Sequence, residues 1–294
     1  MKLPCVLLVL LFGLSACLAG PLKPSASHLS QVRTLLVVPV ESPPLEVTPD
    51  TITTRLPIHR QDDNLQTELF LEPKLYRSPG GVLISGLVSS NDIVKEALPM
   101  RMDRSSGLEP AASHEDAWSP ASVLAAAAVA RLRVAGFEAV ASDQYYSLPI
   151  NPAGDTADLA RWQESIRQWY NRDVSPADYG SRVTGRVDAV LEVGVGTYRI
   201  FYGQIPLQVL VKLIDPVTGR VIGRTEAEAF PVEDSAEALL DHEAEKFKQV
   251  VAEAGAGLMR RALADLGLSP TKAAAASGVS FGMRTASAAG VAAR

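Results

Sequence analysis

The sequence has few of the residues that build metal centres and disulfide scaffolds. Its 294 residues include two cysteines and four histidines. The histidines are His28, His59, His114 and His242. None of them has a second histidine or a cysteine three to five residues away, which is the spacing expected of a zinc site. Both cysteines fall within the first 17 residues, so a disulfide framework is excluded as well. We therefore expect no metal site and no cofactor.

Basic charge is also scarce. Lys and Arg number 28 against 33 Asp and Glu, for a net charge of −5. Because neutralising phosphates requires clustered basic residues, a nucleic-acid partner is not expected. Nucleophile-elbow and P-loop motifs are absent, and Gly194-Val195-Gly196 lacks the third glycine of a dinucleotide site. A hydrolase would need carboxylates such as Asp143 and Asp215 to meet, and Asp215 fits a turn better. We predict that the protein is not an enzyme.

The most distinctive segment is at the N-terminus. Lys2 precedes the apolar run Val6 to Leu14, which has the length of a signal-peptide core and is too short to span a bilayer. The run ends in Leu14-Ser15-Ala16-Cys17, which resembles the lipobox of bacterial lipoproteins. This resemblance implies that residues 1–16 are a signal peptide and that Cys17 carries acyl chains such as palmitate. An ordinary secretory leader cut near Ala19-Gly20, with Cys17 incidental, is the alternative.

Lipidation at Cys17 would define the location of the mature protein. Removing 16 residues from 294 leaves 278, with no free thiol. Acyl chains contribute about 0.8 kcal/mol per buried CH₂, so the lipid would hold the chain firmly on a membrane. Leu18 follows Cys17 where some lipoproteins have Asp; resemblance to Gram-negative lipoproteins then implies the outer membrane, facing the periplasm.

The mature chain is expected to form one folded domain, residues 33–268, between two irregular segments. Residues 17–32 combine Gly, Pro and Ser without apolar periodicity and predict a lipidated tether. Residues 269–294 are rich in Ala, Gly and Ser and predict a disordered tail. Within the domain, the proline-rich residues 43–117 predict an insertion after the first strand, in which 67–71 and 82–88 could pair as a hairpin.

Apolar periodicity predicts the remaining elements. Strands are expected at residues 34–40, 137–140, 187–193, 197–202, 205–214 and 220–229, the last four as an antiparallel meander. One helix begins with Ser119 as its cap and Pro120 in its first turn, and another runs from the cap Ser235 to about Leu266, loosened at Gly255 and Gly257. The fold class is α/β, with helices packed on a mixed sheet.

A further helix, capped by Asp155 or Thr156, has an aromatic face. Leu159, Trp162, Ile166 and Trp169 recur at spacings of three and four residues. This face predicts core packing; the alternative is an exposed ridge that binds a partner.

The order of elements resembles a group of envelope lipoproteins. The segments that carry the resemblance are Leu35-Leu36-Val37-Val38-Pro39-Val40, Gly136-Phe137-Glu138-Ala139-Val140, Val187-Asp188-Ala189-Val190-Leu191-Glu192-Val193, Val211-Lys212-Leu213-Ile214-Asp215 and Thr218-Gly219-Arg220-Val221-Ile222. They are similar to the TolB N-terminal-like fold, which includes CsgG-like secretion lipoproteins. This resemblance implies a role in envelope assembly, secretion or cell-wall synthesis, with a protein partner.

Two functions are open at this point. The first is a non-catalytic interaction module, with the sheet edge, the Trp162/Trp169 helix or the insertion as its surface. The second is a small-solute-binding or transport accessory protein with an aromatic cleft. Its cleft would draw on Tyr145, Tyr146, Trp162, Trp169, Tyr198 and Tyr202. The absence of converging charged residues favours the first, and Trp162, Trp169, Tyr198 and Tyr202 are the candidate partner or ligand surface.

Overall fold

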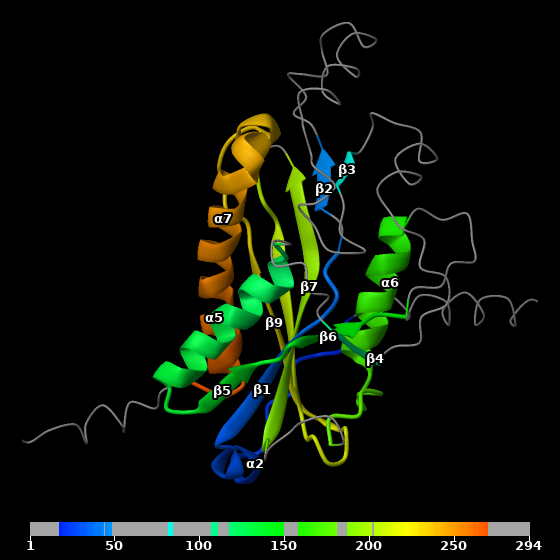
Figure 1. The fold of residues 1–294 in the computed structure, drawn as a ribbon, viewed down its shortest axis with the longest axis vertical. Coiled ribbons are helices and arrows are strands. Elements are labelled where there is room, and N and C mark those ends of the chain that lie inside the picture. Colours follow the sequence, from blue (N-terminus) through cyan, green and yellow to red (C-terminus); the bar gives the residue numbers. More distant parts are fainter. Residues whose placement is uncertain are drawn as a thin grey trace, which may run out of the picture.

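The computed structural model describes residues 18–43, 45–48, 82–84, 107–110, 118–149, 158–180, 187–201 and 203–269. Its elements in chain order are α2 (Ala26–Gln31), β1 (Thr34–Pro39), β2 (Leu45–Thr48), β3 (Val82–Ile84), β4 (Gly107–Pro110), α5 (Pro120–Val134), β5 (Glu138–Ala141), β6 (Gln144–Ser147), α6 (Asp158–Asn171), β7 (Ala189–Phe201), β8 (Leu207–Ile214), β9 (Val221–Ala229) and α7 (Ala236–Asp265) (Figure 1). Cys17 and Tyr202 lie outside the described residues, as does the predicted strand at 67–71.

The long strand β7 organises a seven-stranded mixed sheet. β1 and β2 lie end to end along one edge of β7, both parallel to it, and β5 and β3 extend the sheet beyond them. On the other edge, β8 and β9 follow in antiparallel order. The predicted α/β class, with its mixed sheet and meander, is confirmed.

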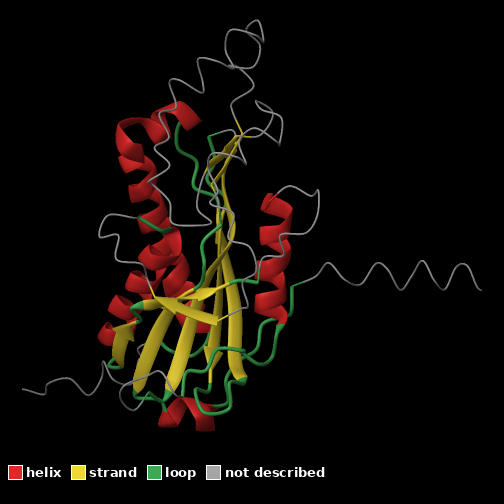
Figure 2. Ribbon diagram, turned by 45° about the vertical axis from the view of Figure 1, so that its right-hand side comes forward, coloured by secondary structure: helices red, strands yellow, loops and turns green. Residues whose placement is uncertain are grey.

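Helices cover both faces of this sheet. α5 and α7 lie together on one face, and α6 lies on the other (Figure 2). The alternation along β7 matches this arrangement, because Leu191, Val193 and Val195 belong to the apolar cluster under α5 and α7, whereas Val190 belongs to the cluster under α6. Each face of β7 is therefore buried by a different helical layer.

The two strands predicted at 187–193 and 197–202 are in fact one strand, β7. The pairing register with β8 shifts between Val195 and Tyr198, so the chain passes through an irregularity without leaving the sheet. Gly194 and Gly196 resembled a strand boundary in the sequence, but glycine is also common at a β-bulge or where another group approaches the backbone closely. A Cβ on Gly194 would lie 2.9 Å from the Trp169 ring, so the close approach of this ring explains the glycine at position 194.

Parts of the predicted insertion belong to the sheets. β2 continues the edge begun by β1, β3 pairs with β2 in parallel, and β4 pairs with β6 in a separate two-stranded sheet. Within the described residues, β3 therefore forms part of the main sheet, and no hairpin partner for it is seen.

The helix termini partly follow the sequence prediction. Ser235 caps α7 as predicted, because its side chain accepts from the Ala238 N–H at 3.2 Å. Ser119 occupies the N-cap position of α5, but its side chain makes no capping bond. Instead Ser42, three residues after the end of β1, accepts from the Ala121 N–H at 3.3 Å. Gly255 does not interrupt α7. A Cβ on Gly255 would lie 2.5 Å from Leu124 of α5, so this glycine permits close helix packing.

Residues 18–32 are packed on the domain, which differs from the predicted tether. The Ala19 N–H donates to Asn171 Oδ1 at 2.6 Å, and Leu22 exchanges two backbone hydrogen bonds of 2.9 Å with Arg224 of β9. Residues 26–31 then form the short helix α2, capped by Ser25. An edge strand offers unpaired N–H and C=O groups, and this segment satisfies those of Arg224.

Candidate functional site

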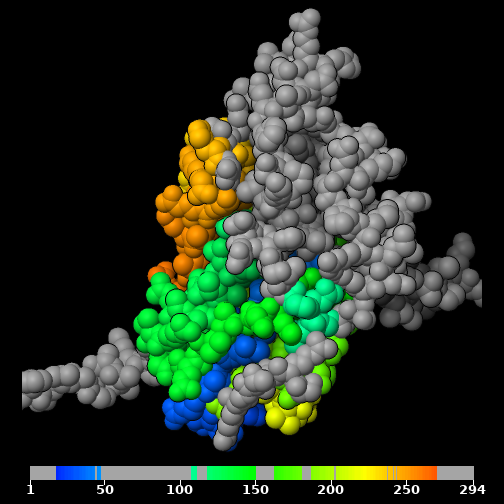
Figure 3. All heavy atoms as spheres, viewed as in Figure 1, coloured from blue at the N-terminus to red at the C-terminus, as the bar shows by residue number. Residues whose placement is uncertain are grey.

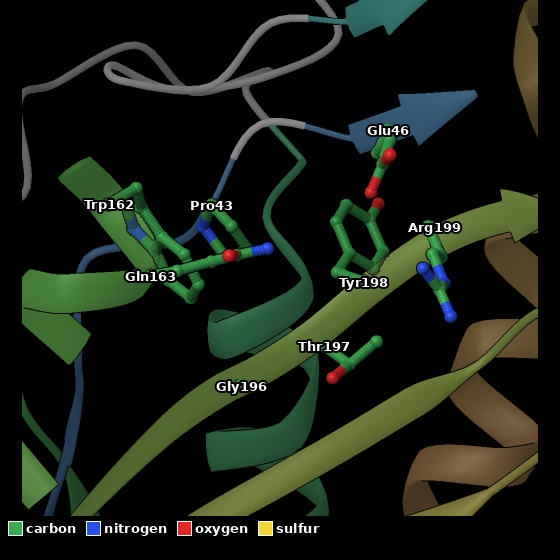
Figure 4. Close-up of a pocket in the computed structure, with 8 residues that line it drawn as sticks. All are labelled: Pro43, Glu46, Trp162, Gln163, Gly196, Thr197, Tyr198 and Arg199. Carbon is green, nitrogen blue, oxygen red and sulfur yellow. The ribbon is translucent and has the colours of Figure 1, made fainter. Parts of the chain in front are cut away.

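A small pocket lies between α6 and the second half of β7 (Figure 4). Its volume is 120 Å³. Its lining residues are Pro43, Glu46, Trp162, Gln163, Gly196, Thr197, Tyr198 and Arg199. Small-molecule sites span roughly 300–1,000 Å³, so this pocket is smaller than the usual site for an organic ligand.

The structure places the predicted aromatic residues mainly in the core. Trp162, Trp169 and Tyr198 are 2%, 1% and 4% exposed. Trp162 and Tyr198 both line the pocket, but Trp169 does not. Tyr145 and Tyr146 are on β6, where the Tyr145 hydroxyl donates to Glu109 of β4. Core packing thus accounts for the aromatic face of α6, and the described members of the predicted set do not form an exposed ridge.

The most unusual polar group is the carboxylate of Glu192, which is completely buried in β7. Three side chains donate to it: Trp169 Nε1 at 2.7 Å, the Tyr179 hydroxyl at 2.5 Å and the Ser175 hydroxyl at 2.9 Å. The Lys212 ammonium lies 3.7 Å from the same carboxylate. A buried charge is tolerated only when it is paired and hydrogen-bonded, and Glu192 has both kinds of partner.

Two cations beside Glu192 hold the C-terminal end of α6. Glu192 pairs in register with Lys212, and Lys212 pairs with Arg224, so the three side chains form a row across β7, β8 and β9. Lys212 Nζ donates to the Trp169 carbonyl at 2.9 Å, and Arg224 donates to the Tyr170 carbonyl at 3.1 Å and to Asp173. Positive charge stabilises a helix C-terminus, whose last carbonyls otherwise lack partners. The row therefore docks α6 on the sheet.

The pKa shifts in this region follow from burial. Burial lowers the pKa of the Lys212 ammonium, and the nearby negative charge of Glu192 opposes that effect. The pKa of the Tyr179 hydroxyl is well above its ordinary value. Burial is the main cause, and the negative charge of Glu192 adds to it. Burial, followed by Glu226, raises the pKa of Tyr170 to about 12. Both tyrosines are therefore protonated at neutral pH, and Tyr179 can act as a donor.

Sequence reasoning missed this network because Lys212 alternates with apolar residues of β8, and such alternation predicts a strand with only one buried face. Lys212 is completely buried. A signal was present: Leu210 and Ile214 flank Lys212 on the same face and are apolar, as expected if a second layer covers that end of the strand.

The polar contacts of the network are internal to the fold. Glu192 does not line the pocket, and its polar contacts serve α6 and residues 175–179. Asp215 is a turn residue, as predicted. Burial alone would raise its pKa, but donors from Val217 and Thr218 hold that pKa below its ordinary value. In the part of the chain that the structure describes, no group of acidic, histidine or cysteine side chains could hold a metal ion, and no helix could cross a membrane.

The molecule is an α/β protein in which a mixed sheet is enclosed by two helical layers. No family model matches the sequence, and no curated protein matches it. The PelC dodecamer from Paraburkholderia phytofirmans is similar at 15% identity, over 50% of this chain and 74% of that one, with a TM-score of 0.27. Lipoprotein GNA1162 from Neisseria meningitidis is similar at 13% identity, over 75% and 99% of the two chains, with a TM-score of 0.18.

Proposed function

We propose that this protein is a non-catalytic interaction module, anchored by lipid on Cys17 to the periplasmic face of the outer membrane of a Gram-negative cell. The observation that carries the proposal is Leu14-Ser15-Ala16-Cys17 at the end of a short apolar run, followed directly by the folded body from Leu18. The partner would belong to an envelope assembly, secretion or cell-wall complex, which is what the resemblance to TolB N-terminal-like lipoproteins implies.

The described residues support binding of a protein more than binding of a solute. The pocket is small, and the buried charged groups hold the fold together. In contrast, β5 is an edge strand among the described residues; its residue Val140 is 53% exposed, and Val134, at the end of α5, is 76% exposed. An exposed sheet edge offers backbone hydrogen bonds and alternate side chains to a partner strand. We infer that the β5 edge is the surface for the partner.

The anchor is tested by Cys17→Ser. Without a thiol, residue 17 cannot accept the diacylglyceryl group, and the membrane affinity contributed by the acyl chains should be lost completely. We expect the variant to leave the membrane fraction and to take up no labelled palmitate, while Cys5→Ser behaves as the unchanged protein. Palmitate incorporated into the Cys17→Ser chain would contradict lipidation at this residue.

The partner surface is tested by photo-crosslinking in intact envelopes. With a photoreactive residue at Val140, we expect a discrete covalent adduct to an envelope protein, because β5 borders the proposed interface. The same residue at Gln249, on the exposed side of α7, is the control and should give little of that adduct. Equal adducts from both positions, or none from Val140, would argue against the β5 edge.

A further inference from the structure

We propose that one end of the domain rests on the lipid surface in which the anchor is inserted. This end surface consists of Leu22, Val174 and Val217. The inference depends on the proposed lipidation of Cys17, and it adds a defined orientation of the protein on the membrane, with β8 and β9 rising from it.

The chain next to Cys17 leaves the domain little freedom to move away from the bilayer. Leu18 is half-buried against the apolar cluster under α6, and the Ala19 N–H is bonded to Asn171 at the end of that helix. Consecutive Cα atoms are about 3.8 Å apart, so a lipid on Cys17 would emerge beside the C-terminus of α6. The residues that directly follow the proposed anchor are thus held on the fold.

Exposed apolar side chains occur at the same end of the molecule. Val217 is 88% exposed in the β8–β9 turn, Val174 is 54% exposed and Leu22 is 40% exposed. Val174 bridges to Arg220 in that turn, and Leu22 bridges to Arg224 four residues further along β9. Helix α2 and the yellow β8–β9 turn lie together at the lower end of the described molecule (Figures 1 and 3).

The β8–β9 turn is held in a fixed shape. The Asp215 carboxylate accepts from the Val217 N–H at 2.9 Å, and the Ser175 N–H donates to the Gly219 carbonyl at 2.8 Å. Gly219 has φ +69°, where a residue with a side chain would be strained. Val217 therefore projects from a rigid turn, and inserting it into a lipid interface would cost little conformational entropy.

The charges around the end surface suit phospholipid headgroups. Three exposed basic residues flank the end surface. Lys23 follows Leu22, Arg172 is two residues before Val174, and Arg220 is in the same turn as Val217. Two of the nearby acids are engaged within the protein, because Asp173 pairs with Arg224 and Asp215 accepts bonds inside its own turn; a third, Asp178, is exposed. Apolar side chains flanked by basic residues are typical of proteins that lie on a bilayer and penetrate about 5–10 Å.

The test measures how closely the end surface approaches lipid. The full, lipidated chain would carry Val217→Cys labelled with an environment-sensitive fluorophore, in vesicles of phosphatidylethanolamine and phosphatidylglycerol. Cys5 is lost with the leader and Cys17 is acylated, so the label has one site. Val232→Cys is the control, because Val232 is also exposed, at 70%, but lies beyond the opposite end of β9, about 27 Å further along the strand.

We expect spin-labelled lipids to quench the Val217 probe at least about twofold more strongly than the Val232 probe, given an interfacial depth within 10 Å. Equal quenching at the two positions in protein that floats with the vesicles would overturn the orientation and leave the lipid anchor intact. Protein that does not float with the vesicles would overturn the proposed anchor, and the orientation would be rejected with it.

Discussion

Replacing Glu192 with leucine is expected to lower the free energy of unfolding by about 3–5 kcal/mol, the cost of breaking a buried ion pair by removing one member. Lys212 would be left buried without the carboxylate 3.7 Å away, and it would either carry an unpaired charge or lose its proton, both of which cost free energy. The Trp169 indole, the Tyr179 hydroxyl and the Ser175 hydroxyl would each lose a buried acceptor. The cost follows from the groups left behind, because leucine itself fills an apolar site well.

Urea unfolding followed by circular dichroism would measure this loss. The double variant Glu192→Leu with Lys212→Met removes both charges and should recover part of the stability, since a buried pair can often be replaced by apolar residues of similar size. Glu164→Gln is the surface control; its ion pair with Arg167 is solvent-exposed, and such pairs contribute at most about 1 kcal/mol. A Glu192→Leu variant as stable as the Glu164→Gln variant would contradict a structural role for the buried carboxylate.

The sequence predicted the elements whose signals are local. Pro120 and the apolar residues that follow it locate α5, the Ser235 cap locates α7, and alternation locates β8. These patterns depend only on capping and on helical or strand periodicity.

The features that depend on distant contacts were not predictable. Leu22 pairs with β9 through backbone hydrogen bonds, which any residue can make. The sequence of residues 18–32 therefore carries no sign of this pairing and resembles that of a tether. Ser42 caps α5 from 79 residues away. The burial of Lys212 depends on α6 covering the second face of the sheet, and that layer cannot be deduced from the alternation in β8 alone.

Replacing Trp169 with alanine is expected to lower the free energy of unfolding by about 3–5 kcal/mol, the usual cost of deleting a buried aromatic ring. The ring is 1% exposed, packs against Gly194, and lies 5.0 Å from the Lys212 ammonium. Combined with Trp162→Ala, the loss would approach a typical total stability of about 5–15 kcal/mol, so the double variant should be largely unfolded at 25 °C.

Phenylalanine substitutions at the two tryptophans separate ring packing from the indole hydrogen bond. Trp169→Phe keeps most of the ring but removes the donor 2.7 Å from Glu192, and hydrogen bonds to charged groups contribute about 1.5–3 kcal/mol. The Trp162 indole N–H has no hydrogen-bond partner among the described residues, so Trp162→Phe removes ring volume alone and should cost less. Denaturant midpoints measured side by side would compare the two. Equal losses would mean that Trp169 stabilises the domain by packing only, and that Glu192 does not depend on its indole donor.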